Sequence, residues 1–118
     1  MIGLVKQLKP RGQIVENRKF DLVISEEATN MIETHINFLM QVSERGAEKL
    51  FIEIKESIKS LNEFPQRNAW FNSPMIPAYT YRKMLVNKRY LIIYEILENT
   101  VFIDYIIDCR QEYSWLTD

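Results

Sequence analysis

The hydrophobic pattern of this chain changes period once, and that change limits the fold more than any other feature. Between residues 25 and 64, apolar residues recur every three or four positions, which is typical of one face of an α-helix. Between residues 79 and 107, short runs rich in Tyr, Ile and Val are separated by turn residues, which is typical of β-strands. Helices followed by strands predict an α+β fold, with the helices on one side of an antiparallel sheet.

Two helices are predicted in the first of these regions. Ser25 has a side-chain oxygen that can cap a helix, and two glutamates follow it where the helix dipole favours anions. This helix is expected to end near Val42, and a turn over residues 43–46 leads into the second helix. Phe64-Pro65 ends the second helix, because proline cannot continue the backbone hydrogen-bond ladder. So short a connection predicts an antiparallel helix hairpin.

The predicted strands lie on either side of this hairpin. A short strand over residues 20–24 precedes it and is expected to join the same sheet as the later strands. Residues 66–78 show no clear period and are predicted to form a loop. We expect one domain over residues 20–118, preceded by an N-terminal extension or extra edge strand over residues 1–19. The later strands are predicted as an antiparallel meander over residues 79–86, 89–97 and 100–107, with turns at Asn87-Lys88 and Glu98-Asn99.

Composition argues against several classes of site. The single cysteine, Cys109, cannot form an internal disulfide, and with the single histidine, His35, it is too little for a zinc site. We therefore expect no metal and no cofactor. No run approaches the roughly 20 apolar residues that cross a bilayer, and residues 1–8 lack the pattern of a signal peptide. The expected location is the cytoplasm, without membrane binding.

Charge is nearly balanced overall but uneven along the chain. The net charge is −1, so nothing draws the whole molecule toward nucleic acid. Residues 1–20 carry five bases and one acid, whereas residues 21–64 carry four bases and nine acids. Residues 65–118 carry six of each, with most bases early, between Arg67 and Arg89. A local basic patch is therefore predicted near the first strands of the meander.

Four segments in this order, at this spacing, resemble the RelE/ParE superfamily of toxins from type II toxin–antitoxin systems. The resemblance extends from Lys19 to Leu116 and therefore covers most of the chain. No single segment is specific for this superfamily, and the resemblance rests on the order and spacing of all four. The segments are Ser25-Glu26-Glu27-Ala28 after the first strand, Ile58–Pro65 at the end of the second helix, Tyr81–Val86 with Tyr90–Tyr94, and Asp108–Tyr113.

The resemblance implies a partner and one of two activities. The partner is a cognate antitoxin protein, usually encoded beside the toxin, which wraps the toxin and blocks growth inhibition. ParE-like members inhibit DNA gyrase, need no catalytic residue and are associated with plasmid stabilization. RelE-like members are mRNA interferases that cut messenger RNA on the ribosome without a metal. A degenerate toxin that survives only as an antitoxin-bound co-repressor is a third alternative.

If the chain is RelE-like, its catalytic residues are expected among bases and a tyrosine on the sheet and tail. Cleavage without a metal requires a group that activates the 2′-hydroxyl, cations that stabilise the phosphorane, and an acid. The resemblance assigns these roles to Arg82, Lys83, Arg110 and Tyr113, and Arg89 could partly replace a family arginine that this chain lacks two residues further on. One position departs from the pattern, because Leu91 stands where the family has an arginine. This departure favours ParE-like binding of gyrase.

Binding of a partner is expected to use aromatic residues in the loop and the tail. Trp and Tyr are the side chains that most often anchor protein interfaces, and Trp70, Tyr113, Trp115 and Leu116 are the candidates here. The antitoxin is expected to dock a helix or to add a strand at a sheet edge.

Several conspicuous side chains also have ordinary structural interpretations. The bases around the hairpin turn can simply be solvated, and Arg110 can form a local ion pair of little energetic value. His35 lies on the apolar stripe of the first helix, and Tyr90 and Tyr94 share a strand face, so all three are predicted to pack in or near the core. Asp104 and Asp108 share a strand face too, but no cleft for glycosidase-like chemistry is predicted around them.

Overall fold

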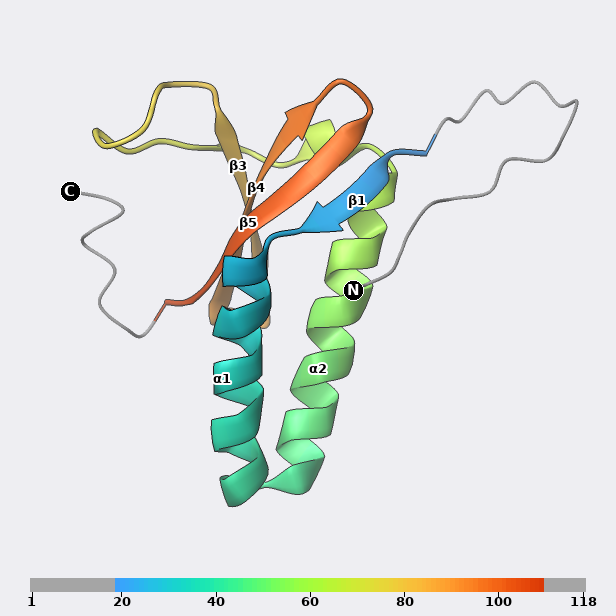
Figure 1. The fold of residues 1–118 in the computed structure, drawn as a ribbon, viewed down its shortest axis with the longest axis vertical. Helices are drawn as coiled ribbons and strands as arrows, with labels where there is room; N and C mark the ends of the chain where they lie inside the picture. The colour runs from blue at the N-terminus through green and yellow to red at the C-terminus, as the bar shows by residue number, and fades with distance from the viewer. Residues whose placement is uncertain (1–18, 110–118) are drawn as a thin grey trace, which may run out of the picture.

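The computed structural model describes residues 19–109, which form two helices packed on a mixed β-sheet (Figure 1). The order is one strand, two helices, two short 3-10 turns and four strands. The predicted α+β class, with its N-terminal strand, helix hairpin and meander, is confirmed. The elements are β1 (Asp21–Ile24), α1 (Glu26–Val42), α2 (Glu44–Lys59), η1 (Ser60–Asn62), η2 (Pro65–Arg67), β2 (Trp70–Phe71), β3 (Tyr81–Val86), β4 (Tyr90–Leu97) and β5 (Thr100–Asp108).

The sheet has five strands in the order β1-β5-β4-β3-β2. The last three strands form the predicted antiparallel meander, and β1 does join the same sheet. It lies parallel to β5, with Asp21 opposite Thr100 and Ile24 opposite Ile103. The first and last described strands are therefore neighbours, and the helix hairpin is the connection that leads away from β1.

Both helices begin at a serine whose side chain caps the first turn. Ser25 Oγ accepts a hydrogen bond from the Ala28 N–H at 2.9 Å, as its position in the sequence predicts. Ser43 caps α2 in the same way through the Gly46 N–H at 3.0 Å, while its own N–H donates to the Leu39 carbonyl oxygen. The hairpin turn is therefore one residue long, shorter than the predicted turn over residues 43–46, because Ser43 ends one helix and starts the next.

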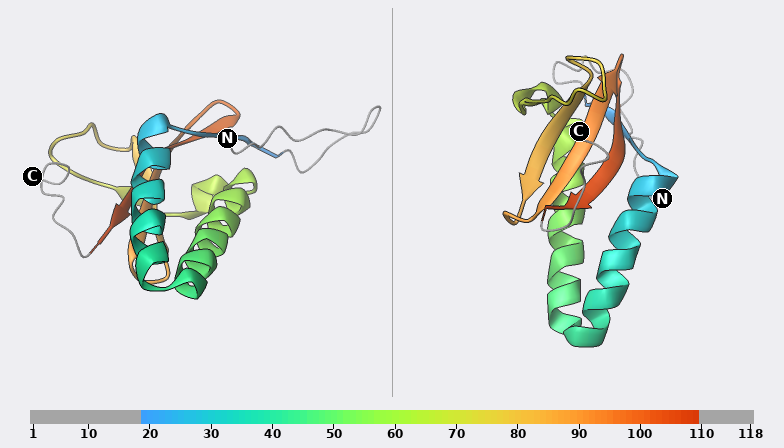
Figure 2. Two further views of the ribbon diagram at one scale, coloured as in Figure 1. Left: turned by 60° about the horizontal axis from the view of Figure 1, so that its bottom comes forward. Right: turned by 90° about the vertical axis from the view of Figure 1, so that its left-hand side faces the viewer.

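The helices cover one face of the sheet, and the main core lies between them (Figure 2). The hairpin projects past the end of the sheet, so its distal turns have no strand beneath them. Tyr90 and Tyr94 lie in this core, as predicted. The buried members of the core are Ala28, Leu50, Ile54, Ile58, Leu61, Val86, Tyr90, Ile92, Tyr94, Val101, Ile103 and Ile106.

A smaller apolar cluster lies on the opposite face of the sheet and is called here the back-face cluster. Its buried members are Phe71, Leu91, Ile93 and Ile107, and Met31 of α1 and Cys109 pack against them. The first five residues of β4 are consequently buried on both faces, which explains their unbroken run of apolar and aromatic side chains.

Residues 66–78 differ from the predicted featureless loop. They begin within the short turn η2, and Trp70 and Phe71 form β2 at the edge of the sheet beside β3. Two residues are too few for a periodic signal, so this strand exists only because the edge of β3 is available to pair with it. Within residues 19–109, no helix is long and apolar enough to cross a membrane.

Candidate functional site

Arg82, on β3, holds the loop that precedes its own strand. Its Nη1 donates hydrogen bonds to the carbonyl oxygens of Gln66 at 3.1 Å and Asn68 at 2.7 Å. The guanidinium carbon lies 3.8 Å from the centre of the Trp70 ring, and the Tyr79 ring meets that ring edge-on at 5.6 Å. A guanidinium stacked on indole is attracted by the negative face of the ring. Arg82 therefore ties β2 and the loop before it to β3.

The Tyr94 hydroxyl secures the same loop from the core side of the sheet. It donates to the Pro65 carbonyl oxygen at 2.6 Å and accepts from Asn68 Nδ2 at 2.9 Å. Burial raises the pKa of Tyr94 above its usual value, so the hydroxyl stays protonated and able to donate. The loop is thus fixed by side chains from two neighbouring strands.

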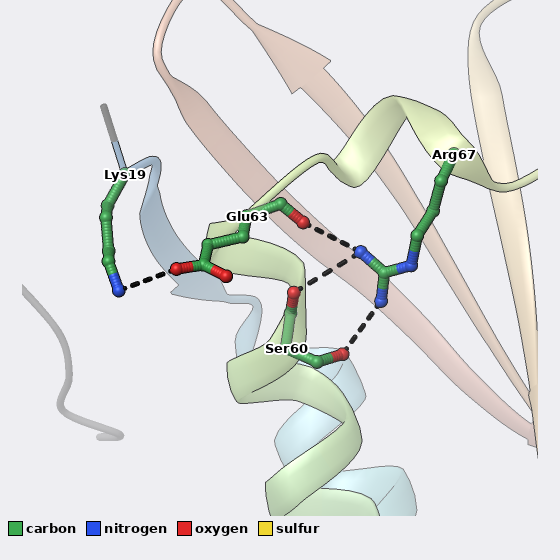
Figure 3. Close-up of polar contacts among 4 residues, drawn as sticks. All are labelled: Lys19, Ser60, Glu63 and Arg67. Atoms are coloured by element: carbon green, nitrogen blue, oxygen red, sulfur yellow. Dashed lines mark hydrogen bonds and ion pairs between the residues drawn. The ribbon is translucent and has the colours of Figure 1, made fainter. Parts of the chain in front are cut away.

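Arg67 closes the C-terminal end of α2 (Figure 3). Its Nη1 donates to the carbonyl oxygens of Ser60, Glu63 and Phe64, and its Nη2 donates to Ser60 Oγ at 2.9 Å. A cation at this end of a helix compensates both the unpaired carbonyls and the helix dipole. Beside it, Lys19 Nζ lies 2.8 Å from Glu63 Oε2, and this hydrogen bond lowers the pKa of Glu63.

A second polar group lies where β5 ends against α1. Arg89 Nη2 is 3.3 Å from Asp108 Oδ2, and His35 Nδ1 is 3.9 Å from the same oxygen. The Asp108 side chain is only 3% exposed, so its charge is compensated inside the fold. The rings of His35 and Tyr90 meet edge-on at 5.5 Å. Burial and the neighbouring Asp108 raise the pKa of the Cys109 thiol, which makes it a poor nucleophile.

A third polar group joins three neighbouring strands. The side chains of Tyr81 on β3, Glu95 on β4 and Asp104 on β5 lie close enough to affect one another's pKa. Burial raises the pKa of both carboxyl groups, and proximity to Asp104 raises that of Glu95 further. Burial and Asp104 also raise the pKa of Tyr81. A protonated Glu95 can donate to an ionised Asp104, so the two carboxyl groups are suited to share one proton.

The structure does not gather the described members of the predicted catalytic set. Arg82 and Lys83 are consecutive strand residues, so their side chains point to opposite faces of the sheet. Arg82 lies opposite Tyr94 in the ladder, whereas Arg89 comes just before Tyr90. About five residues, roughly 16 Å at 3.3 Å per residue, therefore separate the two arginines along β4. Each guanidinium is bonded within the fold, the first to carbonyl oxygens and the second to a carboxylate.

The remaining predicted site residues divide between the loop and the tail. Trp70 lies in β2, half-buried, with its ring between Arg82 and Tyr79. Arg110, Tyr113, Trp115 and Leu116 lie outside the described residues.

Leu91 occupies an apolar environment rather than a polar one. Its side chain is 9% exposed and packs in the back-face cluster with Phe71, Ile93 and Ile107. A charged group buried there would be costly without a partner. The described residues contain no group of three or more His, Cys, Asp or Glu side chains that could hold a metal ion.

The polar groups around Asp104 and Asp108 are hard to predict from the sequence. Ile93 lies opposite Tyr105 but Tyr94 lies opposite Ile103, so Asp104 is an extra residue in β5. Such a bulge breaks the alternation from which faces are assigned. The one available signal was a pair of aspartates in an otherwise apolar strand.

Comparison with known proteins gives a likeness in structure alone. No family model matches the chain, and no curated protein matches it in sequence. Among solved structures, it is similar to a chain of the "Chromosomal ParDE TA system from P. aeruginosa". The two share 14% sequence identity with a TM-score of 0.63, over 77% of this chain and 97% of the other. The protein therefore has a ParE-like α+β fold.

Proposed function

We propose that this protein is the toxin of a type II toxin–antitoxin module, that a cognate antitoxin neutralises it, and that it inhibits growth by binding DNA gyrase. The fold supports the toxin role, because the similar chain comes from a ParDE toxin–antitoxin system. Four ordered sequence segments support the same role independently of the structure.

Leu91 is the observation that favours gyrase over messenger RNA as the target. A ribonuclease of this superfamily needs an arginine at that position to stabilise the phosphorane, and here the position is apolar and buried. Arg82 and Arg89 are poor replacements, because their guanidinium groups already bond to carbonyl oxygens and to Asp108. A protein that inhibits gyrase by binding needs no arginine at this position, because binding requires a complementary surface and not a set of converging cations.

The surface for gyrase is proposed to include Trp70 and the tail residues Tyr113, Trp115 and Leu116. Trp70 is held rigidly by its contacts with Arg82 and Tyr79, so little entropy would be lost when a partner packs against it.

The test is supercoiling of relaxed plasmid by purified DNA gyrase, with and without this protein. We expect inhibition that disappears when the neighbouring antitoxin is added. Lys83→Ala is the matched variant, because Lys83 is exposed and only the nuclease alternative gives it a role. This variant should inhibit gyrase as well as the wild type does.

The opposite result would identify the alternative target. If the folded protein arrests growth but leaves gyrase active, transcripts should be examined in a translating extract. Cleaved messenger RNA with the wild type, and intact messenger RNA with Lys83→Ala, would replace gyrase with the ribosome as the target. A folded protein without any effect on growth would favour the co-repressor role.

A further inference from the structure

Tyr79 is an aromatic residue whose side chain points into solvent just before β3. It is 72% exposed, and its φ of 58° lies in the left-handed region, which is rare for a bulky residue. Glycine and asparagine adopt this conformation in turns at a much lower cost. Among residues 19–109, the other residues with positive φ, glycine apart, are Phe64 after the helix hairpin and the polar hairpin-turn residues Asn87, Lys88 and Glu98. An aromatic side chain at position 79 therefore stores backbone strain that the turn itself does not require.

The ring of Tyr79 is the outermost member of a stack at the edge of the sheet formed by β2 and β3. It meets the Trp70 ring edge-on at 5.6 Å, and the Arg82 guanidinium carbon lies 3.8 Å from the centre of the Trp70 ring. Arg82 is in turn fixed by the carbonyl oxygens of Gln66 and Asn68. Trp70 and Arg82 are half-buried, whereas Tyr79 is mostly exposed. This stack of three side chains, called here the aromatic platform, is therefore fixed at its base and open at its outer end.

The chain around the aromatic platform is positively charged. Residues 64–94 carry five bases and no acid. The guanidinium groups of Arg67 and Arg82 both lower the pKa of the Tyr94 hydroxyl, so both lie near this hydroxyl at the base of the platform. Both groups bond to carbonyl oxygens, and no carboxylate of the described residues forms an ion pair with either of them. A complementary partner surface must therefore be acidic around its apolar contact.

We propose that the aromatic platform binds an apolar side chain within an acidic segment of DNA gyrase, with Tyr79 as the contact residue and Arg82 as a positioning residue. The inference rests on the proposed function and adds to it a contact residue and the chemistry of the gyrase segment. Tyrosine is among the side chains that most often anchor interfaces. Because the ring of Tyr79 is already held against Trp70, it loses little entropy on binding. Carboxylates beside the contact are attracted by the charges of Arg67 and Arg82.

The strain at Tyr79 allows a binding role to be separated from a structural one. Asparagine adopts positive φ more readily than tyrosine, so Tyr79→Asn relieves strain and removes the ring at the same time. Relief of the strain offsets the lost contact with Trp70, so we expect a thermal midpoint at least equal to that of the wild type. Half inhibition of gyrase should require at least about tenfold more of this variant, as for the loss of an interface anchor. Tyr79→Phe keeps the ring and should inhibit as the wild type does.

Titration of each full-length variant into the supercoiling reaction of purified gyrase measures these differences. Phe51→Ala is the matched control, because Phe51 is an aromatic residue that is 50% exposed on α2, outside the aromatic platform. This control should inhibit gyrase as the wild type does. Undiminished inhibition by Tyr79→Asn, with a lowered thermal midpoint, would show a purely structural role and overturn the inference alone. A folded wild-type protein that leaves gyrase active would instead contradict the proposed function, so the two failures are distinguishable.

Crosslinking tests the chemistry of the gyrase segment. A photoreactive benzoylphenylalanine in place of Tyr79 should crosslink to gyrase, and the same group in place of Phe51 should not. Mass spectrometry of the crosslinked gyrase peptide should identify a segment in which Asp and Glu outnumber Lys and Arg. A crosslink to a neutral or basic segment would overturn the acidic partner surface. Absence of the crosslink at position 79, in a protein that still inhibits gyrase, would overturn the aromatic platform as the contact.

Discussion

At the scale of single residues, Glu95 and Asp104 give the stability of the folded protein a pH dependence opposite to that of an ordinary paired carboxylate. Burial is the main cause of the raised pKa of both groups. A folded-state pKa above the unfolded value means that the folded protein binds more protons, so stability falls as pH rises. The contribution of these two groups to stability is fully present at pH values below their ordinary pKa values, 4.5 for Glu and 3.8 for Asp. It is lost as the pH rises through their raised pKa values in the folded protein.

The variant Glu95→Gln should isolate this effect. Glutamine keeps the size and the hydrogen-bond donor but cannot become an anion beside Asp104. We expect it to be about 1 kcal/mol more stable than the wild type at pH 7.5, the size of a typical net hydrogen bond, and equal to it at pH 4. Urea unfolding at both pH values measures the difference, with Glu48→Gln on the exposed side of α2 as control. An equal change at both pH values would contradict the shared-proton arrangement.

At the scale of elements, the two helix caps resemble each other in sequence but not in tertiary role. Ser43 lies at the exposed hairpin turn and serves only the two helices that it joins. Ser25 caps α1 and also donates to the Asp104 carbonyl oxygen of β5, so one hydroxyl group fixes both the start of the helix and its position on the sheet. The second bond is made at the residue where β5 bulges.

Replacing each serine by alanine should therefore have unequal effects. Loss of a cap costs about 0.5–2 kcal/mol. We expect Ser25→Ala near the upper end of this range, because it also leaves a partly buried carbonyl without its donor, and Ser43→Ala near the lower end. Thermal and urea unfolding monitored by circular dichroism can rank the two variants. A larger loss for Ser43→Ala would show that the contact with Asp104 adds nothing.

At the scale of the whole molecule, the contact between the first and last described strands closes the fold. Ile103 on β5 lies opposite Ile24 of β1 on one side and opposite Tyr94 of β4 on the other. Its side chain is fully buried in the main core under the helices. One residue thus connects the edge strand, the meander and the helix hairpin, so these parts should unfold together.

Ile103→Ala should reveal this connection. A cavity at so central a position costs about 2–5 kcal/mol, and the helix signal and the tyrosine fluorescence should shift to the same lower denaturant midpoint. Leu97→Ala, at an exposed position on β4, should change stability by less than about 0.5 kcal/mol. Separate transitions for the two signals would mean that the hairpin is stable without β5.

The sequence by itself determined the features that depend on neighbours only a few positions apart. The helical stripes, the cap at Ser25 and the turns after β3 and β4 all lie where the pattern predicts them. The second helix is expected to end at Phe64-Pro65, but α2 ends at Lys59 and the 3-10 turn η1 follows it. In both hairpin turns a residue other than glycine has positive φ, including Asn87. Such local signals suffice because caps, turns and hydrophobic periods are set by interactions within about four residues along the chain.

Only the tertiary structure decided the features that depend on residues distant in the sequence. The parallel pairing of β1 with β5 joins residues 21 and 100, and β2 exists because β3 offers an edge. Arg82 on β3 and Arg89 in the turn before β4 have the same charge, yet one holds a loop and the other a buried carboxylate. Asn68 and Asp108, the bonding partners of Arg82 and Arg89, lie 14 and 19 residues away in the sequence, so the order of the strands, and no local pattern, brings each pair together.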